Sequence, residues 1–317
     1  MSAERLMVVT GQSGFVGSRL GRMLHGDLND GNNLRVAPPN CELWSSEIAL
    51  DLVDQDSIER YLGDICPDVV IHLAGQTFVP TSFENPAATF DVNLHGTLNL
   101  LTALKRRDFK GRFLYISSGD VYGQVPEEEL PIVEARQIAP RNPYAVSKGA
   151  AELLCQQWNY TEAFEVMIAR PFNHIGPGQR DSFVVAAMAR QIARVKLGKQ
   201  SAEIQVGDVD VSRDFLHVDD VIQAYFHILE KGRAGEIYNV CAGQDFVVRD
   251  LILKMADLAC VAIELHQDPQ RLRRSEQKRV IGNPAKLSRD TGWAPSISMD
   301  SALEDVLDYW IKKESHD

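Results

Sequence analysis

Four residues that could together move a proton lie within one short stretch of this chain. Tyr144 and Lys148 are four positions apart, and the pair Ser117-Ser118 ends 26 residues before Tyr144. Residues four apart lie on the same face of a helix, so the Lys148 ammonium would stand near the Tyr144 phenol. A free tyrosine has a pKa near ~10, and a neighbouring cation favours the phenolate and lowers that pKa. With a serine hydroxyl to hold the oxygen of an alcohol or carbonyl, these groups could transfer a proton while a hydride moves elsewhere.

The Tyr-x-x-x-Lys spacing alone is weak, because an exposed helix pair of this kind contributes only ~0.2–0.5 kcal/mol and occurs in many chains. The catalytic interpretation therefore depends on a dinucleotide site upstream. The segment from Gly11 to Gly17 (Gly-Gln-Ser-Gly-Phe-Val-Gly) follows an apolar run at residues 6–10 and opens a helix. In that context Gly11 allows a tight turn, Gly14 lets the backbone approach a pyrophosphate, and Gly17 lets the helix pack closely on the strand. The predicted cofactor-binding residues here are Gly11, Ser13, Gly14, Phe15, Val16 and Gly17.

Further cofactor contacts are expected where later strands end. These candidates are Asp51, Leu52, Leu73, Ala74, Gly75 and Asn93, and for each a helix cap or a turn is an equally good explanation. An NAD enzyme usually has an acidic residue at the end of the second strand. Residues 34–37 (Leu-Arg-Val-Ala) have none, and Arg35 could face a 2′-phosphate. The sequence therefore favours NADPH, with NADH as the alternative.

The elements that must position these residues alternate between strand and helix. Short apolar runs at 6–10, 69–73, 113–117 and 166–170 are typical of buried parallel strands, and helical stretches at 86–107 and 144–160 lie between them. This alternation predicts an α/β fold, a Rossmann-type doubly wound parallel sheet. We expect residues 1–170 to form the NAD(P)-binding domain. Residues 171–317 would mainly form a smaller, partly interleaved substrate lobe, with segments such as 212–240 returning to the first domain.

Composition narrows the class of protein. The formal net charge is −11, which argues against general binding to nucleic acid or to an anionic membrane. The five cysteines lack metal-ligand spacing, so we expect no metal site, no disulfide framework and buried reduced thiols. The N-terminus does not resemble a signal peptide and no apolar run is long enough to span a bilayer, so we expect a cytoplasmic protein.

Taken together, Gly11-x-x-Gly14-x-x-Gly17, Ser118 and Tyr144-x-x-x-Lys148 resemble the extended short-chain dehydrogenase/reductases that act on nucleotide sugars. The resemblance covers essentially the whole chain. Residues 170–174 (Arg-Pro-Phe-Asn-His), 212–217 (Ser-Arg-Asp-Phe-Leu-His) and the stretch 273–286 resemble the GDP-mannose branch of that family. The resemblance implies a cytoplasmic, NADPH- or NADH-dependent enzyme, commonly a homodimer, that serves nucleotide-sugar synthesis for surface polysaccharide. It also implies a GDP-sugar cleft between the lobes.

The resemblance assigns roles to individual residues. Tyr144 would donate the proton to the C4 oxygen of the sugar, Lys148 would lower the tyrosine pKa and hold the nicotinamide ribose, and Ser118 would hydrogen-bond the reacting oxygen. The residues expected to bind substrate are Ser118, Asn173, Arg213, Arg273, Arg274 and Glu276. A solvated basic loop is the alternative for the arginine cluster, and which arginine points inward is left open.

The same motifs leave the reaction open between a C4-ketone reductase and a 4,6-dehydratase. Dehydratases of this branch resemble Thr-Ser-Glu or Thr-Asp-Glu before the Leu/Val-Tyr-Gly, whereas this chain has Ser118-Gly119-Asp120. Asp120 keeps a carboxylate that is one methylene shorter, so we expect it to orient substrate and the enzyme to be a reductase. Reduction from one face gives GDP-D-rhamnose and from the other GDP-6-deoxy-D-talose. A C4 epimerase and a non-catalytic NADP-sensing Rossmann protein are further alternatives.

Overall fold

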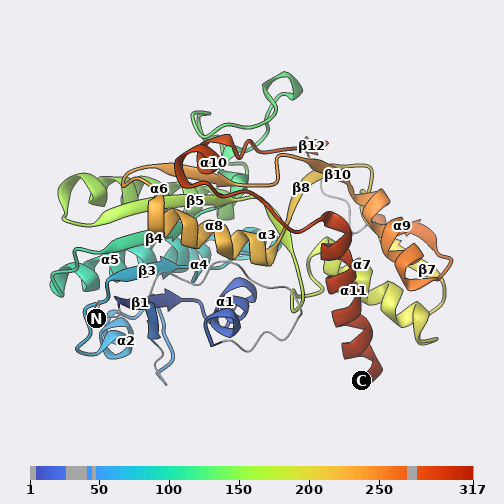
Figure 1. Cartoon of the computed structure of the whole chain (residues 1–317), viewed down its shortest axis with the longest axis horizontal. Helices are drawn as coiled ribbons and strands as arrows, with labels where there is room; N and C mark the ends of the chain where they lie inside the picture. Colours follow the sequence, from blue (N-terminus) through green and yellow to red (C-terminus); the bar gives the residue numbers. More distant parts are fainter. Residues whose placement is uncertain (1–4, 26–40, 45–47, 270–276, 317) are drawn as a thin grey trace.

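The large lobe is built on a six-stranded parallel sheet (Figure 1). The computed structural model describes residues 5–25, 41–44, 48–269 and 277–316. The order of the strands in the sheet is β2-β1-β3-β4-β5-β9, and each neighbouring pair is parallel. Their bounds are β1 Arg5–Thr10, β2 Cys41–Trp44, β3 Val69–His72, β4 Arg112–Ile116, β5 Glu165–Pro171 and β9 Ile237–Val240. The predicted doubly wound parallel sheet is confirmed.

Alternating side chains of these strands enter two separate cores. Val8, Val70 and Phe113 pack on one face, while Met7, Ile71 and Leu114 pack on the other. Because both faces are buried, the strands read in the sequence as continuous apolar runs. The first face is covered by α2 Gln55–Leu62, α5 Gly96–Arg106 and α6 Pro143–Thr161. The second face is covered by α1 Phe15–His25, α8 Val218–Lys231 and α10 Ala285–Thr291.

The helix expected at 86–107 contains an irregularity. It consists of α4 Pro86–Phe90, a π-helical turn η1 Asp91–His95, and α5, preceded by the short α3 Val79–Glu84. A π turn inside a helix adds a residue to one turn and is often found at functional sites. Here it carries Asn93.

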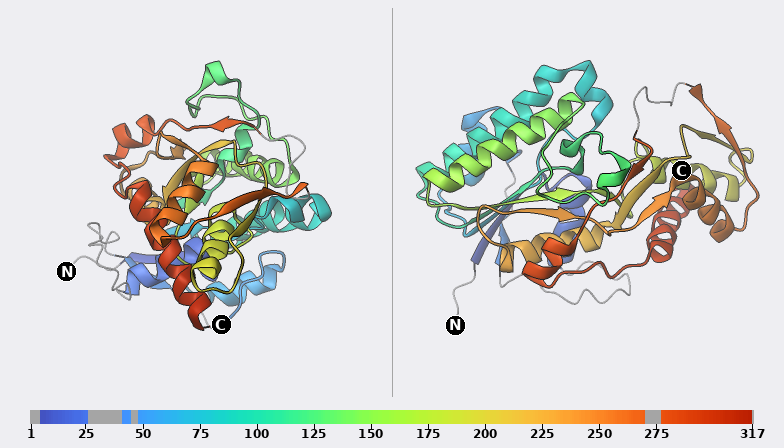
Figure 2. Two further views of the ribbon diagram at one scale, coloured as in Figure 1. Left: turned by 90° about the vertical axis from the view of Figure 1, so that its right-hand side faces the viewer. Right: turned by 90° about the horizontal axis from the view of Figure 1, so that it is seen from above.

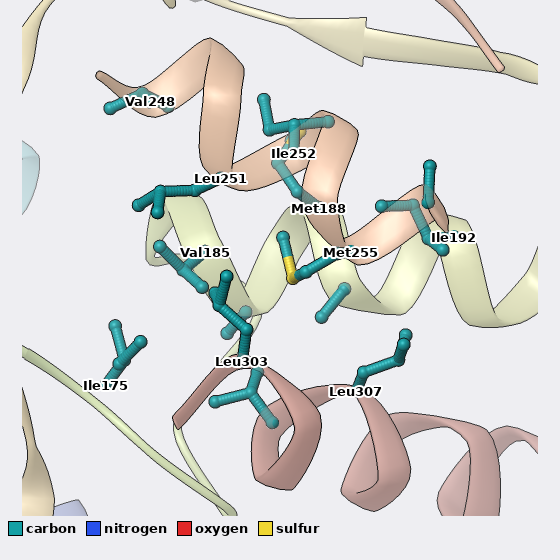
Figure 3. Close-up of a cluster of buried hydrophobic side chains, with 14 of the residues drawn as sticks. Ile175, Val185, Met188, Ile192, Val248, Leu251, Ile252, Met255, Leu303 and Leu307 are labelled. Atoms are coloured by element: carbon teal, nitrogen blue, oxygen red, sulfur yellow. The ribbon is translucent and has the colours of Figure 1, made fainter. Parts of the chain in front are cut away.

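In its described residues, the small lobe holds two short sheets and three packed helices. Strand β8 Ser212–His217 pairs with β6 Asn173–Ile175, β10 Asp245–Val247 and β12 Arg279–Val280, and β7 Glu203–Val206 pairs with β11 Glu264–Gln267. The helices are α7 Val184–Lys196, α9 Val248–Ala259 and α11 Met299–His316. Met188 on α7, Met255 on α9 and Leu303 on α11 meet in one apolar core (Figure 3). Figure 2 places this lobe beyond one end of the large sheet.

The segment 212–240 is divided between the lobes. Strand β8 lies in the small sheet, whereas α8 packs on the large sheet and β9 extends it next to β5. The chain thus crosses to the small lobe after β5 and returns through α8.

Candidate active site

The glycine-rich turn follows β1. The next two strands of the chain, β2 and β3, lie on opposite sides of β1, so the strand order reverses at this point. Gly11 follows β1 with φ +77°, and the N–H of Gly14 donates to the Gly11 carbonyl at 3.0 Å. A Cβ on Gly17 would lie 2.2 Å from the oxygen of Gly11, so only glycine fits there. Ser13 and Gly14 are exposed, and Phe15 and Val16 begin α1. A crevice at such a switch point, with a helix N-terminus facing it, suits a dinucleotide pyrophosphate.

The proton-transfer residues meet at the carboxyl end of β4. The side chains of Ser118 and Tyr144 are hydrogen-bonded to each other. Lys148, one turn along α6, donates from Nζ to the carbonyl oxygen of Ile116 at 2.7 Å and lies 4.9 Å from the ring centroid of Tyr115. Asn142 caps α6 by accepting from the N–H of Ala145 at 2.7 Å, which fixes where the helix begins.

The surroundings of Tyr144 and Lys148 shift the pKa of each residue. Burial raises the pKa of Tyr144 well above its ordinary value, the Asp120 carboxylate raises this pKa further, and the bond with Ser118 opposes both. The ammonium of Lys148 is directed at the Ile116 carbonyl. Burial in turn lowers the pKa of Lys148 to about 8. At neutral pH the site therefore holds a protonated phenol beside an ammonium.

Asn93 ties the loop after β3 to the catalytic helix. Its Oδ1 accepts from the N–H of Gln76 at 2.8 Å, and its Nδ2 donates to the carbonyl of Gln76 at 3.0 Å and to Oγ of Ser147 at 2.9 Å. Both amide hydrogens are used within the protein. These bonds make Asn93 a residue that positions α6, and the expected cofactor contact stays a prediction.

A buried chain of hydrogen bonds that the sequence analysis did not identify lies behind the glycine turn. Nδ1 of His72 lies 2.7 Å from Oγ1 of Thr10, and its Nε2 lies 3.0 Å from Oγ1 of Thr97. Thr97 donates to the carbonyl of Asn93 at 2.7 Å, so its hydroxyl accepts from Nε2 of His72. Burial, with a contribution from Lys148, lowers the pKa of His72 to about 3, so this imidazole is neutral. The alternation of buried side chains in β1 and β3 was the signal that could have paired Thr10 with His72.

The remaining cofactor candidates are residues 51, 52 and 73–75. The N–H of Ala74 donates to Oγ1 of Thr10 at 3.2 Å, and a Cβ on Gly75 would lie 2.9 Å from Oδ1 of Asn93 and 3.5 Å from Nζ of Lys148. Asp51 is exposed and accepts from the N–H of Val53 in a local turn, whereas Leu52 is buried in the core beneath Gly96. Leu73 is half-buried.

Some candidates fall outside the described residues. Residues 34–37, including Arg35, and the segment with Arg273, Arg274 and Glu276 are not described. Among the described residues, β1 pairs with Cys41–Trp44 on the side away from β3, and these residues come later in the chain than those on which the cofactor choice was based.

Besides Ser118, the described substrate candidates are Asn173 and Arg213, which lie on neighbouring strands of the small sheet. Asn173 begins β6 and is in register with Phe215 of β8, and Arg213 lies two residues earlier on β8. Arg213 is half-buried and donates from Nη1 to the carbonyl of Ser212 at 2.8 Å. Asp214 beside it is fully buried and accepts from the N–H groups of Ala242, Gly243 and Gly282 at 2.7, 3.0 and 3.2 Å. The strand β8 is thereby fastened to the large lobe.

His174 links the two lobes on the cofactor side. Its ring stacks on Phe15 at the start of α1, with centroids 6.0 Å apart and planes 4° from parallel. Its Nδ1 faces the carbonyl of Phe172 at 3.0 Å.

The cysteines are unpaired thiols, as expected, but they are not all buried. Cys155 and Cys241 are buried, while Cys66 and Cys260 are exposed. Within the described residues, no helix combines the length and apolar character needed to cross a bilayer.

Comparison with known proteins agrees with this geometry. The family model for GDP-mannose 4,6 dehydratase matches residues 8–306. The chain is 54% identical over 307 residues to GDP-6-deoxy-D-mannose reductase of Pseudomonas aeruginosa, with 96% of each chain covered. It is 27% identical to GDP-mannose 4,6 dehydratase 2 of Caenorhabditis elegans, covering 96% of this chain and 88% of the relative.

Solved structures lead to the same group. RMD from Pseudomonas aeruginosa, complexed with NADPH, superposes with a TM-score of 0.91 at 52% identity, covering 98% of this chain and 99% of that one. A Thermus thermophilus UDP-glucose 4-epimerase in complex with NAD gives a TM-score of 0.81 at 28% identity, covering 96% and 98%. With a family model matching nearly its whole length, the chain belongs to the GDP-mannose 4,6 dehydratase family.

Proposed function

We propose that this protein is an NADPH-dependent GDP-4-dehydro-6-deoxy-D-mannose reductase, which reduces the C4 ketone of its substrate to give GDP-D-rhamnose. The observation that carries the proposal is the buried, protonated Tyr144 hydrogen-bonded to Ser118 beside Lys148. The 54% identity to a GDP-6-deoxy-D-mannose reductase supports the substrate, because 6-deoxy-D-mannose is D-rhamnose.

The proton chemistry follows from the tyrosine. A bound nicotinamide cofactor supplies the hydride to C4, and the oxygen then needs a proton. Because burial raises the pKa of Tyr144, its phenol holds that proton at neutral pH and stands ready to donate it. Ser118, which shares a hydrogen bond with Tyr144, would bind the same oxygen and stabilise negative charge as it develops. Lys148, kept charged, would stabilise the phenolate that remains.

The residues that would hold the cofactor fit a dinucleotide. The turn from Gly11 to Gly17 brings backbone to the start of α1 where side chains would not fit, and Gly75 brings backbone close to Asn93 and Lys148. The buried Oγ of Ser117 and Oε1 of Gln76 have no hydrogen-bond partner, and both follow strands at this edge. NADPH is the proposed cofactor, since a relative 52% identical was solved with it.

Asp120 is the residue that favours a reductase over a dehydratase. A dehydratase needs a carboxylate placed to remove the C5 proton, and here that position holds the shorter Asp120 in the η2 turn Gly119–Tyr122. A displacement of ~1 Å can lower a rate about a hundredfold. Asp120 raises the pKa of Tyr144, which favours the proton donor that a reductase requires.

The substrate would lie across the small sheet. With Ser118, the described residues proposed to contact the GDP-sugar are Asn173 and Arg213, and Arg273, Arg274 and Glu276 are proposed to contact its pyrophosphate and nucleoside. Guanidinium groups match phosphate oxygens in geometry and charge.

The decisive experiment incubates the purified protein with GDP-4-dehydro-6-deoxy-D-mannose and either NADPH or NADH. Faster consumption of NADPH, with GDP-D-rhamnose identified by NMR, is the expected result. GDP-6-deoxy-D-talose as product would correct the stereochemistry. Untouched cofactor, or conversion of GDP-mannose without added reductant, would overturn the reductase in favour of a sensor or a dehydratase.

A homodimer is the proposed assembly. Val146, Leu153 and Tyr160 follow one another at intervals of seven along α6, and Leu153 and Tyr160 are 61% and 83% exposed. Seven residues make two helical turns, so these side chains form one stripe along α6, which runs beside α5 (Figure 2). An unpartnered apolar stripe of this length suits a second copy of the same helix.

The assembly can be tested by mass. Leu153→Glu is expected to convert a dimer into a monomer in size-exclusion chromatography with light scattering. Leu253→Glu changes an exposed leucine on α9 and serves as the matched control. A monomeric wild type would contradict the dimer.

The proposed compartment is the cytoplasm. Its reducing conditions agree with five thiols that form no disulfide.

A further inference from the structure

A buried ion pair lies one helical turn beyond Lys148 and takes no part in the chemistry described above. Glu152 on α6 and Arg170 on β5 share two hydrogen bonds, Nε to Oε1 at 2.9 Å and Nη2 to Oε2 at 2.6 Å. They are 1% and 3% exposed. Removing such a pair from water is costly, and well-packed apolar side chains often stabilise a fold as much or more. The charges at this position therefore need an explanation other than stability.

The carboxylate lies in line with the catalytic residues. Tyr144, Lys148 and Glu152 follow one another at intervals of four on α6, and all three are buried. Glu152 is therefore the next group along the face that carries Lys148. Burial lowers the pKa of Lys148 to about 8, while Cys155 first and the charge of Glu152 second act in the opposite direction.

Other groups around Lys148 do not replace that charge. On β4, the ammonium also faces the carbonyl of Ile116 and the ring of Tyr115. The imidazole of His72 on β3 and the thiol of Cys155 on α6 lie near it as well. The imidazole is neutral, and burial raises the pKa of both the Cys155 thiol and the Tyr115 phenol, so both stay uncharged. Glu152 is the fully buried anion of this group.

The arginine connects the same pair to the turn that carries Ser118. The guanidinium carbon of Arg170 lies 4.7 Å from the ring centroid of Tyr122, the last residue of η2. The hydroxyl of Tyr122 donates to Oδ1 of Asn239 on β9 at 2.6 Å. Ser118 is the residue that caps η2, so the ion pair joins the helix of Tyr144 to the turn of Ser118.

We propose that Glu152 and Arg170 are positioning residues for proton transfer, which keep Lys148 charged and hold the Ser118 turn against the Tyr144 helix. Neither residue touches the substrate. The inference rests on the proposed reductase function.

The test measures how kcat/KM for ketone reduction depends on pH in two variants, one that removes the negative charge of the pair and one that removes the positive charge. Glu152→Gln removes the anion and leaves the guanidinium, so Lys148 loses its proton more easily and the alkaline limb moves to lower pH by about one unit. Arg170→Gln leaves the anion alone beside Lys148, and the limb moves to higher pH. Glu165→Gln is the matched control, because Glu165 pairs with Arg112 at 3.0 Å on the surface, away from the site; its profile should coincide with that of the wild type.

Two further measurements keep the inference testable. Either single variant leaves a buried charge without its partner, so a variant that does not fold is replaced by Glu152→Met/Arg170→Met, which leaves none. That variant should keep its Tm while the plateau of kcat/KM falls at least about tenfold, in the range seen when catalytic groups are misplaced. The Lys148 titration, followed by NMR of 15N-lysine and assigned with Lys148→Met, reports the pKa without any turnover.

The outcomes separate this inference from the proposed function. A wild type that does not reduce the ketone contradicts the function, while an NMR shift of Lys148 in Glu152→Gln still supports the charge effect. The positioning role would be overturned if the alkaline limbs of kcat/KM coincide in all variants or if the NMR titration of Lys148 does not move. It would also be overturned if the plateau of kcat/KM in the double variant stays within twofold of the wild type.

Discussion

Nζ of Lys148 lies 2.7 Å from the carbonyl oxygen of Ile116, so the helix that carries the proton donor is bonded to the last residue of β4. Ser118 follows two residues later and is hydrogen-bonded to Tyr144. The lysine thus helps to set the distance between the two groups that would face a substrate oxygen, while burial and Asp120 raise the tyrosine pKa and Ser118 lowers it.

Replacing the proton donor should abolish most of the reduction. Tyr144→Phe keeps the ring and removes the hydroxyl, so we expect kcat to fall by ~10²–10⁴-fold, the usual contribution of a general acid. Binding of NADPH, measured by fluorescence titration, should change little. Tyr309→Phe, on α11 of the small lobe, is the control and should keep full activity. A Tyr144→Phe enzyme with wild-type kcat would exclude Tyr144 as the donor.

Asp120 should prove dispensable for ketone reduction. Its carboxylate raises the pKa of Tyr144, so Asp120→Asn lowers that pKa. Burial is the larger cause and still keeps the phenol protonated, so the rate at pH 7 should be largely kept and the alkaline limb, which follows Lys148, should stay in place. The pH profile of NADPH consumption measures both. A collapse at pH 7 as deep as that of Tyr144→Phe would contradict the orienting role.

The neutral His72 predicts a pH-dependent stability. Its pKa is about 3 in the folded protein and near 6.5 in the unfolded chain. Below pH 6.5 the unfolded state therefore binds a proton that the folded state does not, so stability is complete above this pH and falls on acidification by up to ~1.4 kcal/mol per unit. Urea unfolding at pH 7, 6 and 5 should show a shallower decline in His72→Gln than in the wild type. His95→Gln, an exposed histidine on η1, should retain the wild-type slope.

Removal of the Asp214 carboxylate should destabilise the junction between the lobes. Asp214→Ala leaves three buried N–H groups without an acceptor, and each unsatisfied group costs ~1–3 kcal/mol. We expect a loss of at least ~3 kcal/mol in urea unfolding at pH 8, where the carboxylate is charged because its pKa, raised by burial, is about 6. Asp210→Ala, which breaks an exposed pair with Arg249, should change stability little. Equal midpoints for the two variants would show that the three bonds contribute nothing.

Local patterns were sufficient to predict the parallel sheet and much of the proposed site. A buried parallel strand must be apolar throughout, and a turn that approaches a phosphate needs glycine, so β1, β3 and the segment 11–17 carry their structure in their residues. The four-residue spacing of Tyr144 and Lys148 likewise fixes a shared helix face.

Long-range contacts required the tertiary structure. Lys148 bonds to Ile116, 32 positions earlier, and Thr10 meets His72 across 62 positions, and no local period encodes such pairs. Burial depends on every element packed around a group, so the raised pKa of Tyr144 and the internal use of the Asn93 amide could not be deduced from spacing. The sequence by itself determined which residues could do the chemistry. Only the tertiary structure decided their protonation, because desolvation is a property of the whole fold.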